Sequence, residues 1–432
     1  MTTSRHIQRV YLTLMLGNTL AASFIWGINT IFLLDAGLSN FQAFAANAFF
    51  TAGMVVFEIP TGIVADTIGR RVSYLAGTLT LMVTTLLYVL LWQMEGPFWA
   101  WAVVSMLLGL GFTFFSGAVE AWLVDALDAT GFTGSLEAVF GRGQIVTGIG
   151  MLTGSVAAGF VAQATSLAVP FVMRAVVLVV MFGYAFFAMK DLGFEPKKSD
   201  GTLREMRTIL DDSIEYGWRV PSIKWMMLAS PFTAGVGIYA FYALQPFLLE
   251  LNGNPEAYGI AGVTAAIVAG AQIVGGVAAP RIRGLFRLRT SALLLAVGVS
   301  ASTLLLIGIF SQFWAVIALI SVWGLMFAAS MPIRQSYMNG MIPSNQRATI
   351  LSFDSMLGSS GGVVIQPVLG RAADTYSYAT SYMFGAAFTT MALPFIWLSR
   401  RQKASADAGV STPGAEGTVE PTPEGQVEDG PP

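Results

Sequence analysis

The stretch that decides the fold is FEIPTGIVADTIGRR, residues Phe57–Arg71, in which an apolar segment ends in an acid, two glycines and two arginines. The residues before it are apolar for long enough to cross a bilayer, and a second apolar segment begins directly after Arg71. Glycines permit a tight turn, and arginines on a short loop are typical of the cytoplasmic side of a membrane protein. The stretch therefore predicts a short loop between two membrane-spanning helices.

The composition of the chain places it in lipid. Of its 432 residues, 55% are hydrophobic and 11% are charged, whereas soluble domains carry about 25% charge. The net charge of −2 and the lack of a basic cluster exclude nucleic-acid binding. The absence of Cys and the single His exclude disulfides and thiolate or histidine-rich metal sites. No Gly-x-x-x-x-Gly-Lys stretch occurs, so nothing in the sequence indicates that ATP powers the protein.

Apolar segments of roughly 20 residues recur along the chain, and each is long enough to cross about 30 Å of hydrocarbon. They occupy residues 10–34, 41–65, 72–94, 98–125, 143–165, 169–190, 224–249, 257–280, 289–311, 313–340, 347–371 and 379–399. The sequence therefore predicts an all-α membrane protein with twelve transmembrane helices.

The Lys and Arg residues predict the orientation of these helices, because cytoplasmic loops are enriched in both. With the N-terminus inside, all but three of the 23 Lys and Arg residues fall on the cytoplasmic side, the exceptions being Arg174, Arg334 and Arg371. We therefore expect a multi-pass protein of the cell (inner) membrane with both termini in the cytoplasm.

A polar segment at 191–223 divides the spans into six and six. We expect two pseudo-symmetric six-helix bundles, at 1–190 and 224–400, because internal repeats are common in secondary carriers. The linker is expected to form an amphipathic helix, since Leu203, Met206, Leu210 and Ile214 are spaced as one helical face. The tail, 401–432, is rich in Pro, Gly and Glu and is expected to be disordered.

Together these features resemble the major facilitator superfamily, and in particular its 12-span drug-efflux type. The resemblance rests on twelve spans, their six-plus-six division and the loop motif Gly62-x-x-x-Asp66-x-x-Gly69-Arg70-Arg71. It covers residues 1–400 and implies a transporter in which two bundles enclose a central cavity.

The resemblance also implies a role for the loop motif as a latch. In similar proteins the motif acid meets the N-terminus of the eleventh span, which begins here near Arg347, and a motif arginine pairs with an acid that ends the fourth span. We therefore expect an Arg70–Asp125 ion pair and a contact of Asp66 that lock the bundles together when the carrier faces outward. The alternative is a topology anchor and a solvated turn.

Five ionisable side chains fall inside the predicted spans: Glu58, Glu120, Arg174, Arg334 and Asp354. Each costs at least about 2.5–3.5 kcal/mol on insertion scales, so each needs a function or a partner. Four lie in the cytoplasmic half, whereas Arg174 lies near the outer end of its span. Because the resemblance implies that the fourth and tenth spans face each other, we expect a Glu120–Arg334 pair across the cavity; the alternative is a permanent structural pair.

Proton coupling requires a carboxyl group that gains and loses a proton near the working pH. Glu58 and Asp354 are the better candidates and Glu120 is a third, because an acid held against Arg334 stays ionised. The alternative for Glu58 is a structural hydrogen bond within its own segment.

Two features bear on the direction of transport. Gly150-x-x-x-Gly154-x-x-x-x-Gly159 in the fifth span resembles the antiporter motif of the superfamily, with Ser in place of its Pro and Ala in place of one Gly, and predicts a smooth face that packs against the eighth span. The alternative is ordinary packing of small residues. Drug/proton antiporters often carry an acid in the first span, where this sequence has Asn18 and Asn29.

The spans that the resemblance places around the cavity are rich in aromatic residues, which suit apolar or flat organic molecules, and two buried arginines could hold an anion. Packing and lipid contact are the alternative for these side chains. The cavity candidates are Phe24, Trp26, Trp122, Arg174, Tyr239, Tyr242, Gln245, Arg334 and Tyr337.

The sequence thus predicts a secondary active transporter that works by alternating access, most simply a proton-coupled exporter of lipophilic small molecules or drugs. The alternatives are a proton-coupled symporter of a metabolite or organic anion, and a non-transporting membrane receptor or lipid flippase. We expect no enzymatic activity, no cofactor and no metal site. The expected partners are a small-molecule substrate, protons and the lipid bilayer, and the protein is expected to act as a monomer.

Overall fold

The computed structural model describes residues 3–194, 196, 218–310, 312–342 and 347–408, and its regular elements in these ranges are all helical. The predicted linker helix at 203–214 and nearly all of the tail lie outside the described residues. The first bundle contains α1 (Ser4–Trp26), α2 (Asn29–Asp35), α3 (Asn40–Thr67), α4 (Arg70–Gln93), α5 (Phe98–Thr113), α6 (Ala118–Ala129), α7 (Leu136–Ala164) and α8 (Ala168–Ala188).

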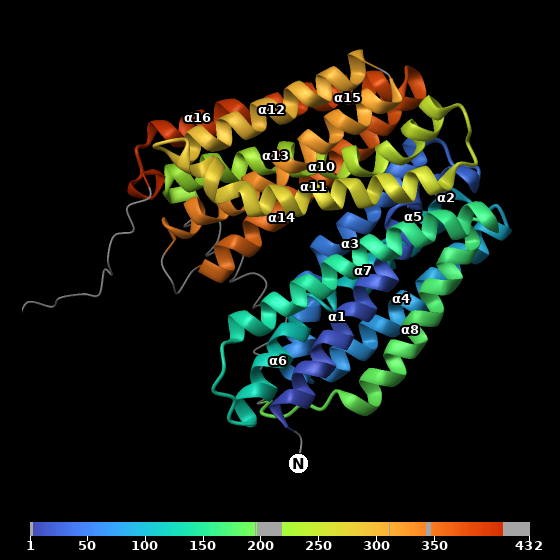
Figure 1. Cartoon of the computed structure of the whole chain (residues 1–432), viewed down its shortest axis with the longest axis vertical. Helices are drawn as coiled ribbons and strands as arrows, with labels where there is room; N and C mark the ends of the chain where they lie inside the picture. Colours follow the sequence, from blue (N-terminus) through green and yellow to red (C-terminus); the bar gives the residue numbers. More distant parts are fainter. Residues whose placement is uncertain (1–2, 195, 197–217, 311, 343–346, 409–432) are drawn as a thin grey trace, which may run out of the picture.

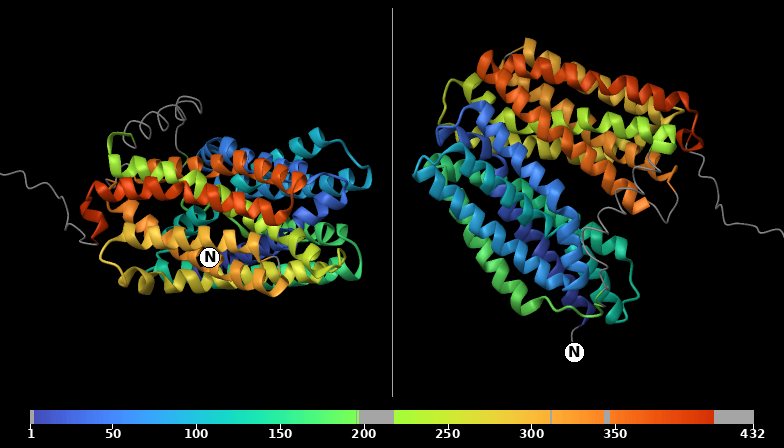
Figure 2. Two further views of the ribbon diagram at one scale, coloured as in Figure 1. Left: turned by 90° about the horizontal axis from the view of Figure 1, so that it is seen from above. Right: turned by 180° about the vertical axis from the view of Figure 1, so that it is seen from behind.

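The second bundle is built from the C-terminal half of the chain. It contains α10 (Pro221–Asn252), α11 (Tyr258–Gly284), α12 (Arg289–Ile309), α13 (Phe313–Asn339), α14 (Arg347–Thr375), α15 (Tyr378–Thr390) and α16 (Ala392–Arg401), followed by the short 3-10 helix η2 (Ser405–Asp407). Figure 1 shows that the two bundles meet at one end and diverge toward the end where α1 begins and α16 terminates. The view from behind in Figure 2 shows the same V shape.

The expected spans are present as helices or helix pairs. By length and apolar composition, ten of the described helical segments can cross a membrane, and the pair α1–α2, bent by 44°, makes eleven. The remaining expected span, the eleventh, is α14, which is long enough but more polar, because it carries Asp354 and Gln366. This polarity is consistent with its place, since α14 packs between α10 of its own bundle and α3 of the other.

Three spans that the sequence predicts as continuous are each divided into two helices, and the twelfth is interrupted at Met391, between α15 and α16. The first span is interrupted at Gly27 and Ile28, between α1 and α2, and the fourth at residues 114–117, between α5 and α6. Gly117 adopts a φ of +68°, which a glycine reaches without strain and which ends the regular helix there. Breaks of this kind at membrane depth are tolerated where the backbone lines a cavity or is buried in protein.

The two bundles contact each other mainly through two helix pairs, α3 with α14 and α7 with α11. At the second pair glycines permit the approach. A methyl group on Gly159 would lie 2.7 Å from the Tyr258 carbonyl oxygen and 3.0 Å from the Gly262 Cα atom. Of the predicted antiporter motif, Gly159 therefore faces the eighth span as expected, whereas Gly150 and Gly154 face α1, the latter against Ser23.

This contact yields a prediction for stability. Gly159→Ala should lower the thermal unfolding temperature of the detergent-purified protein, because overpacking a tight contact costs about 1–3 kcal/mol. Gly148→Ala on the same helix is the matched control, since a methyl group there meets only the Ile273 Cδ1 atom at 3.8 Å. Equal unfolding temperatures for the two variants would contradict the close contact.

Candidate functional site: a charged cleft between the bundles

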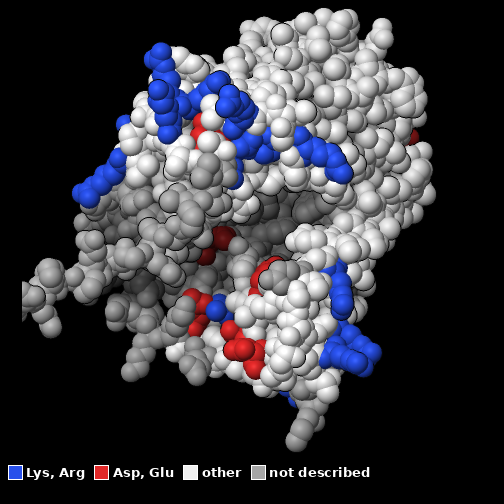
Figure 3. All heavy atoms as spheres, turned by 60° about the vertical axis from the view of Figure 1, so that its left-hand side comes forward, with Lys and Arg blue, Asp and Glu red and all other residues white. Residues whose placement is uncertain are grey.

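The divergence of the bundles leaves a hollow that opens toward one end of the molecule. Figure 3 shows this hollow between the two halves, with Lys and Arg side chains along its rims and acidic side chains within it. Two cavities form parts of its walls, one of about 440 Å³ on the N-terminal bundle and one of about 350 Å³ on the C-terminal bundle. The hollow is the candidate site for a solute.

The N-terminal wall is formed by α1 and by the break in the fourth span. Asn18, Trp26, Phe112 and Glu120 line its cavity. Glu120 lies in the first turn of α6, where the helix dipole favours a carboxylate. The Trp26 carbonyl accepts a hydrogen bond of 2.6 Å from Gln245 of the other bundle, so this wall faces the opposite half.

Glu58 reaches the same break from α3. Its Oε1 atom accepts a hydrogen bond of 2.5 Å from the Ser116 hydroxyl, which lies in the interruption between α5 and α6. The alternative role predicted for Glu58 was a structural hydrogen bond to a group in its own segment. The structure instead joins Glu58 to the broken fourth span, beside the cavity that Glu120 lines.

The C-terminal wall contains a two-pronged ion pair. The Nη1 and Nη2 atoms of Arg334 lie 2.5 and 2.6 Å from the two oxygens of Asp354, and Nη2 also donates to the Met226 carbonyl at 3.2 Å. The Asp354 side chain is only 7% exposed. Paired donors and acceptors of this geometry are among the stronger polar contacts in proteins.

This ion pair corrects the predicted partner of Arg334 and bears on the prediction that Asp354 couples protons. The expected Glu120–Arg334 pair is not present, because Asp354 on the neighbouring helix of the same bundle occupies both ends of the Arg334 guanidinium. The acid held against Arg334 is therefore Asp354 and not Glu120. Asp354 is therefore the weaker candidate, and Glu58 and Glu120 are the stronger ones.

Arg174 lies behind the N-terminal wall. It is 1% exposed, and its Nε atom donates to the Thr85 hydroxyl at 3.0 Å while Nη1 lies 3.4 Å from the Ala21 carbonyl. Its guanidinium lies 5.5 Å from the centre of the Phe112 ring, which lines the cavity. Among the described residues no carboxylate forms an ion pair with it. Arg174 thus supports the wall, and Phe112 separates it from the hollow.

The aromatic candidates divide into two groups. Trp26 lines the N-terminal cavity, and Tyr242 is partly buried near the closed end. Trp122, Tyr239 and Tyr337 instead serve helix packing, since each is at most 2% exposed. Their polar atoms are satisfied inside a bundle or at its surface: Trp122 donates to the Lys190 carbonyl, Tyr239 to Ser381, and Tyr337 contacts Ser399. Phe24 is 6% exposed and lines neither cavity.

The loop motif forms a cluster at the open end of the N-terminal bundle. Arg70 forms an ion pair with Asp66, and the predicted pair with Asp125 is also present, with Nε 3.9 Å from Oδ2. Gly69 turns the chain with a φ of +136°, as expected. Among the described residues, a methyl group at Gly62 would meet no atom within 4 Å, so none of them packs closely against this glycine. Arg347 begins α14, and its side chain lies outside the described residues.

Asp191 completes this cluster and was not foreseen from the sequence. It lies just beyond the end of α8, and its Oδ1 atom accepts a hydrogen bond of 2.9 Å from the Arg71 backbone N–H. Burial raises the pKa of the Asp191 carboxyl above its usual value, although the hydrogen bond and the two arginines act in the opposite direction. The only signal in the sequence was an acid directly after a span.

The opposite end of the molecule is closed by a second acid that the sequence did not reveal. The two carboxylate oxygens of Asp374, at the end of α14, accept hydrogen bonds of 2.9 and 2.8 Å from the backbone N–H groups of Asn40 and Phe41. These groups form the first turn of α3 in the other bundle. Tyr378 adds a hydrogen bond to the Asn40 side chain. A charge from one bundle thus caps a helix of the other.

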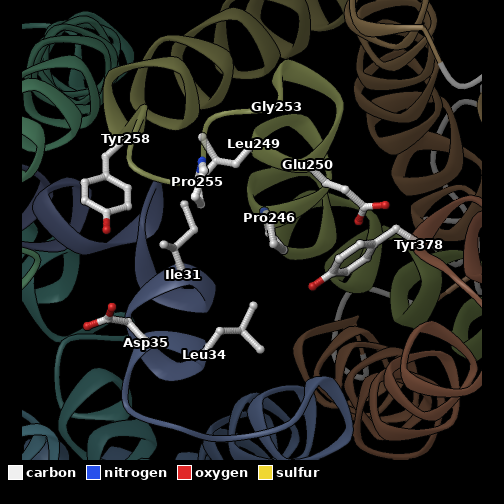
Figure 4. Close-up of a pocket in the computed structure, with 10 residues that line it drawn as sticks. All are labelled: Ile31, Leu34, Asp35, Pro246, Leu249, Glu250, Gly253, Pro255, Tyr258 and Tyr378. Carbon is white, nitrogen blue, oxygen red and sulfur yellow. The ribbon is translucent and has the colours of Figure 1, made fainter.

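Outside this closure lies a separate pocket of about 570 Å³. Figure 4 shows Ile31, Leu34 and Asp35 from α2 on one side and Pro246, Leu249 and Glu250 from α10 on the other. The pocket lies between elements of both bundles at the end where they meet. It marks the outer boundary of the contact that would have to open for a solute to pass.

Two bundles of membrane-spanning helices around a charged cleft, open at one end and closed at the other, define a membrane transporter. The chain belongs to the Major Facilitator Superfamily, whose family model matches residues 11–364. The match is to the superfamily as a whole and does not select its drug-efflux type. No relative among the curated proteins matches the sequence.

The solved structures that the fold resembles are transporters. A point variant of the nucleoside transporter NupG aligns with a TM-score of 0.74 at 13% identity, over 91% of this chain and 99% of that one. A bacterial homologue of the human lysosomal transporter Spinster, inward-facing and unoccupied, aligns at 0.72 and 12%, over 94% and 98%. A D-xylose–proton symporter aligns at 0.65 and 16%, over 91% and 97%. At these identities the likeness establishes the fold.

The corrected ion pair can be tested by exchanging charges. Arg334→Asp alone should destabilise the protein strongly, because breaking a buried pair costs about 3–5 kcal/mol. Arg334→Asp combined with Asp354→Arg should recover much of the loss in a thermal unfolding measurement. As a control, Arg334→Glu combined with Glu120→Arg should recover none. If thermal stability recovers in the Glu120 control and not in the Arg334–Asp354 exchange, the predicted Glu120–Arg334 pair would be restored.

Proposed function

We propose that this protein carries a small organic solute across the membrane by alternating access, with the cleft as the solute path and protons as the coupling ion. The observation that carries the proposal is the cleft itself, charged within, open at one end, and closed at the other by the Asp374 contact. The distribution of Lys and Arg supports the assignment of the open end to the cytoplasm. The likeness to a transporter solved inward-facing supports that assignment.

Glu58 and Glu120 are the proposed proton carriers. Glu120 lines the N-terminal cavity, and Glu58 bonds to Ser116 of the same cavity. Neither acid forms an ion pair within the described residues, unlike Asp354. A carboxyl group without a neighbouring cation can accept a proton without breaking an ion pair. Protonation of either group would remove a charge from the cleft and ease its closure.

Two kinds of cargo fit the cleft. Export of a lipophilic compound is supported by the aromatic side chains of the N-terminal wall, Trp26, Phe112 and Phe115. Proton-linked uptake of a polar metabolite is supported by the resemblance to a D-xylose–proton symporter and a nucleoside transporter. A third hypothesis for the same fold is a receptor without transport activity or a lipid flippase.

Transport by purified protein in proteoliposomes, with an imposed pH gradient and a panel of dyes, drugs, sugars and nucleosides, tests the proposal. Glu58→Gln should abolish movement driven by the pH gradient while leaving solute exchange at equal pH, because only the protonation step is lost. Glu95→Gln, an exposed acid at the outer end, is the control and should behave as the wild type. Absence of transport for every compound would favour a receptor.

The two acids at opposite ends of the α3–α14 pair predict opposite conformational shifts. Asp374→Asn should weaken the outer closure and lengthen the distance between labels at Glu95 and Asn252 on the two bundles. Asp66→Asn should weaken the inner latch instead, leaving the outer end closed and transport impaired while membrane insertion stays normal.

These distances can be measured by spin labels on introduced cysteines, because the natural chain has none. Glu256→Gln, at an exposed outer acid, is the matched control. Outer-end distances in Asp374→Asn that match those of the control would show that the contact does not hold the bundles together. Full transport by Asp66→Asn would leave the loop motif as a topology anchor.

A further inference from the structure

A group of uncharged polar side chains lies buried where the two bundles meet. We call it the amide belt, and it consists of Asn29 and Thr30 of α2, Asn47 and Thr51 of α3, Gln245 of α10 and Gln366 of α14. All six are at most 7% exposed. Two members come from the C-terminal bundle and four from the N-terminal bundle. Sequence analysis had named Asn29 and Gln245 but gave no reason to group them.

The belt is joined by hydrogen bonds within and between the bundles. Asn29 donates to the Asn47 side chain at 2.9 Å. Across the bundles, the Gln245 side chain accepts a hydrogen bond of 3.2 Å from the Thr30 backbone, and the Gln366 amide donates to the Thr51 hydroxyl at 3.3 Å. Opening of the outer end must break both of these last contacts.

Three polar atoms of the belt have no hydrogen-bond partner among the residues that the structure describes: Asn47 Nδ2, Gln366 Oε1 and Thr30 Oγ1. Leaving a buried polar group without a partner destabilises the protein, and most buried polar groups in native structures have a partner. The set contains a free donor and free acceptors from both bundles. Buried polar groups that stay unpaired despite this cost indicate a partner that is absent while the outer end is closed.

The position of the belt identifies that partner as the solute. Asn47 lies seven residues from the outer end of α3 at Asn40, or ~10 Å along the helix, and Gln366 lies eight residues before Asp374, or ~12 Å. The belt therefore lies on the cleft side of the outer closure, a level that we call the roof of the cleft. Its Gln245 side chain donates to the carbonyl of Trp26, which lines the N-terminal cavity. When the outer end opens, its amides and hydroxyls face the cavity with their hydrogen bonds unmade.

We propose that the amide belt recognises a neutral solute rich in hydroxyl groups, of the sugar or nucleoside class, with Asn47 and Gln366 as contact residues. The inference rests on the proposed function and selects among its cargoes. Amides both donate and accept, which matches hydroxyl groups and leaves no charge to satisfy. A lipophilic solute would leave the same atoms unpaired, and sites built on such groups discriminate strongly against ligands that lack the matching polar atoms.

The test is ligand binding by the full-length protein in detergent, followed by thermal stabilisation, with monosaccharides, nucleosides and lipophilic dyes as separate arms. Gln366→Met preserves volume and removes the amide. It should weaken the binding of the hydroxylated ligand at least tenfold and leave the unfolding temperature without ligand nearly unchanged, since Thr51 keeps its bond to the Asn47 carbonyl. Gln93→Met, an exposed amide at the end of α4, is the control.

The possible outcomes distinguish the amide-belt proposal from the proposed transport function. Stabilisation by a sugar or by a nucleoside, lost in Gln366→Met and kept in Gln93→Met, supports the belt and tells the two ligand sources apart. Binding of lipophilic dyes alone, unchanged in Gln366→Met, overturns it while proton-driven transport of those dyes still supports the carrier. A fall in the ligand-free unfolding temperature with unchanged affinity assigns Gln366 a structural role and also overturns the proposal. Failure of every hydroxylated compound to bind does so too.

Discussion

The contact of Asp374 with the first turn of α3 is the constraint on which this state depends. It joins a full negative charge to unpaired backbone N–H groups and the positive end of a helix, a pairing that helix termini favour. The α3 and α14 helices run in opposite directions, because the C-terminal end of α14 meets the N-terminal end of α3. Asp66 lies near the C-terminal end of α3, toward the open end. Under the proposed function, a rocking motion would exchange the Asp374 contact for the proposed Asp66 latch.

The membrane spans and their division into two halves could be predicted from the sequence, because the sequence directly gives the length of the apolar segments and the positions of the cations. The breaks in the first and fourth spans could not. The first break begins at Gly27 and the fourth-span break ends at Gly117, in a chain with 46 glycines, several of which instead pack against a neighbouring helix. Periodicity and hydropathy do not distinguish a glycine that ends a helix from one that packs against another.

The sequence predicted many of the charged residues of the candidate site but not all of the pairs that they form. Arg334 was assigned to Glu120 from the expected facing of two spans, whereas Asp354 lies only 20 residues away on the next helix and reaches both guanidinium nitrogens. Asp374 and Asp191 were missed for a different reason. Each binds backbone N–H groups, 334 and 120 residues distant in the chain, and no side chain in the sequence marks a backbone group as a partner.

The charged side chains and the amides of the cleft suit different functions. Arg334 and Asp354 satisfy each other, and Arg174 is separated from the hollow by Phe112, so neither arginine presents an uncompensated charge to a solute. The acids left without a cation, Glu58 and Glu120, lie together on one wall near the open end. The neutral amides lie at the roof. A carrier built in this way would bind its solute with uncharged groups and use its carboxylates for protons, so that loading one ligand need not displace the other.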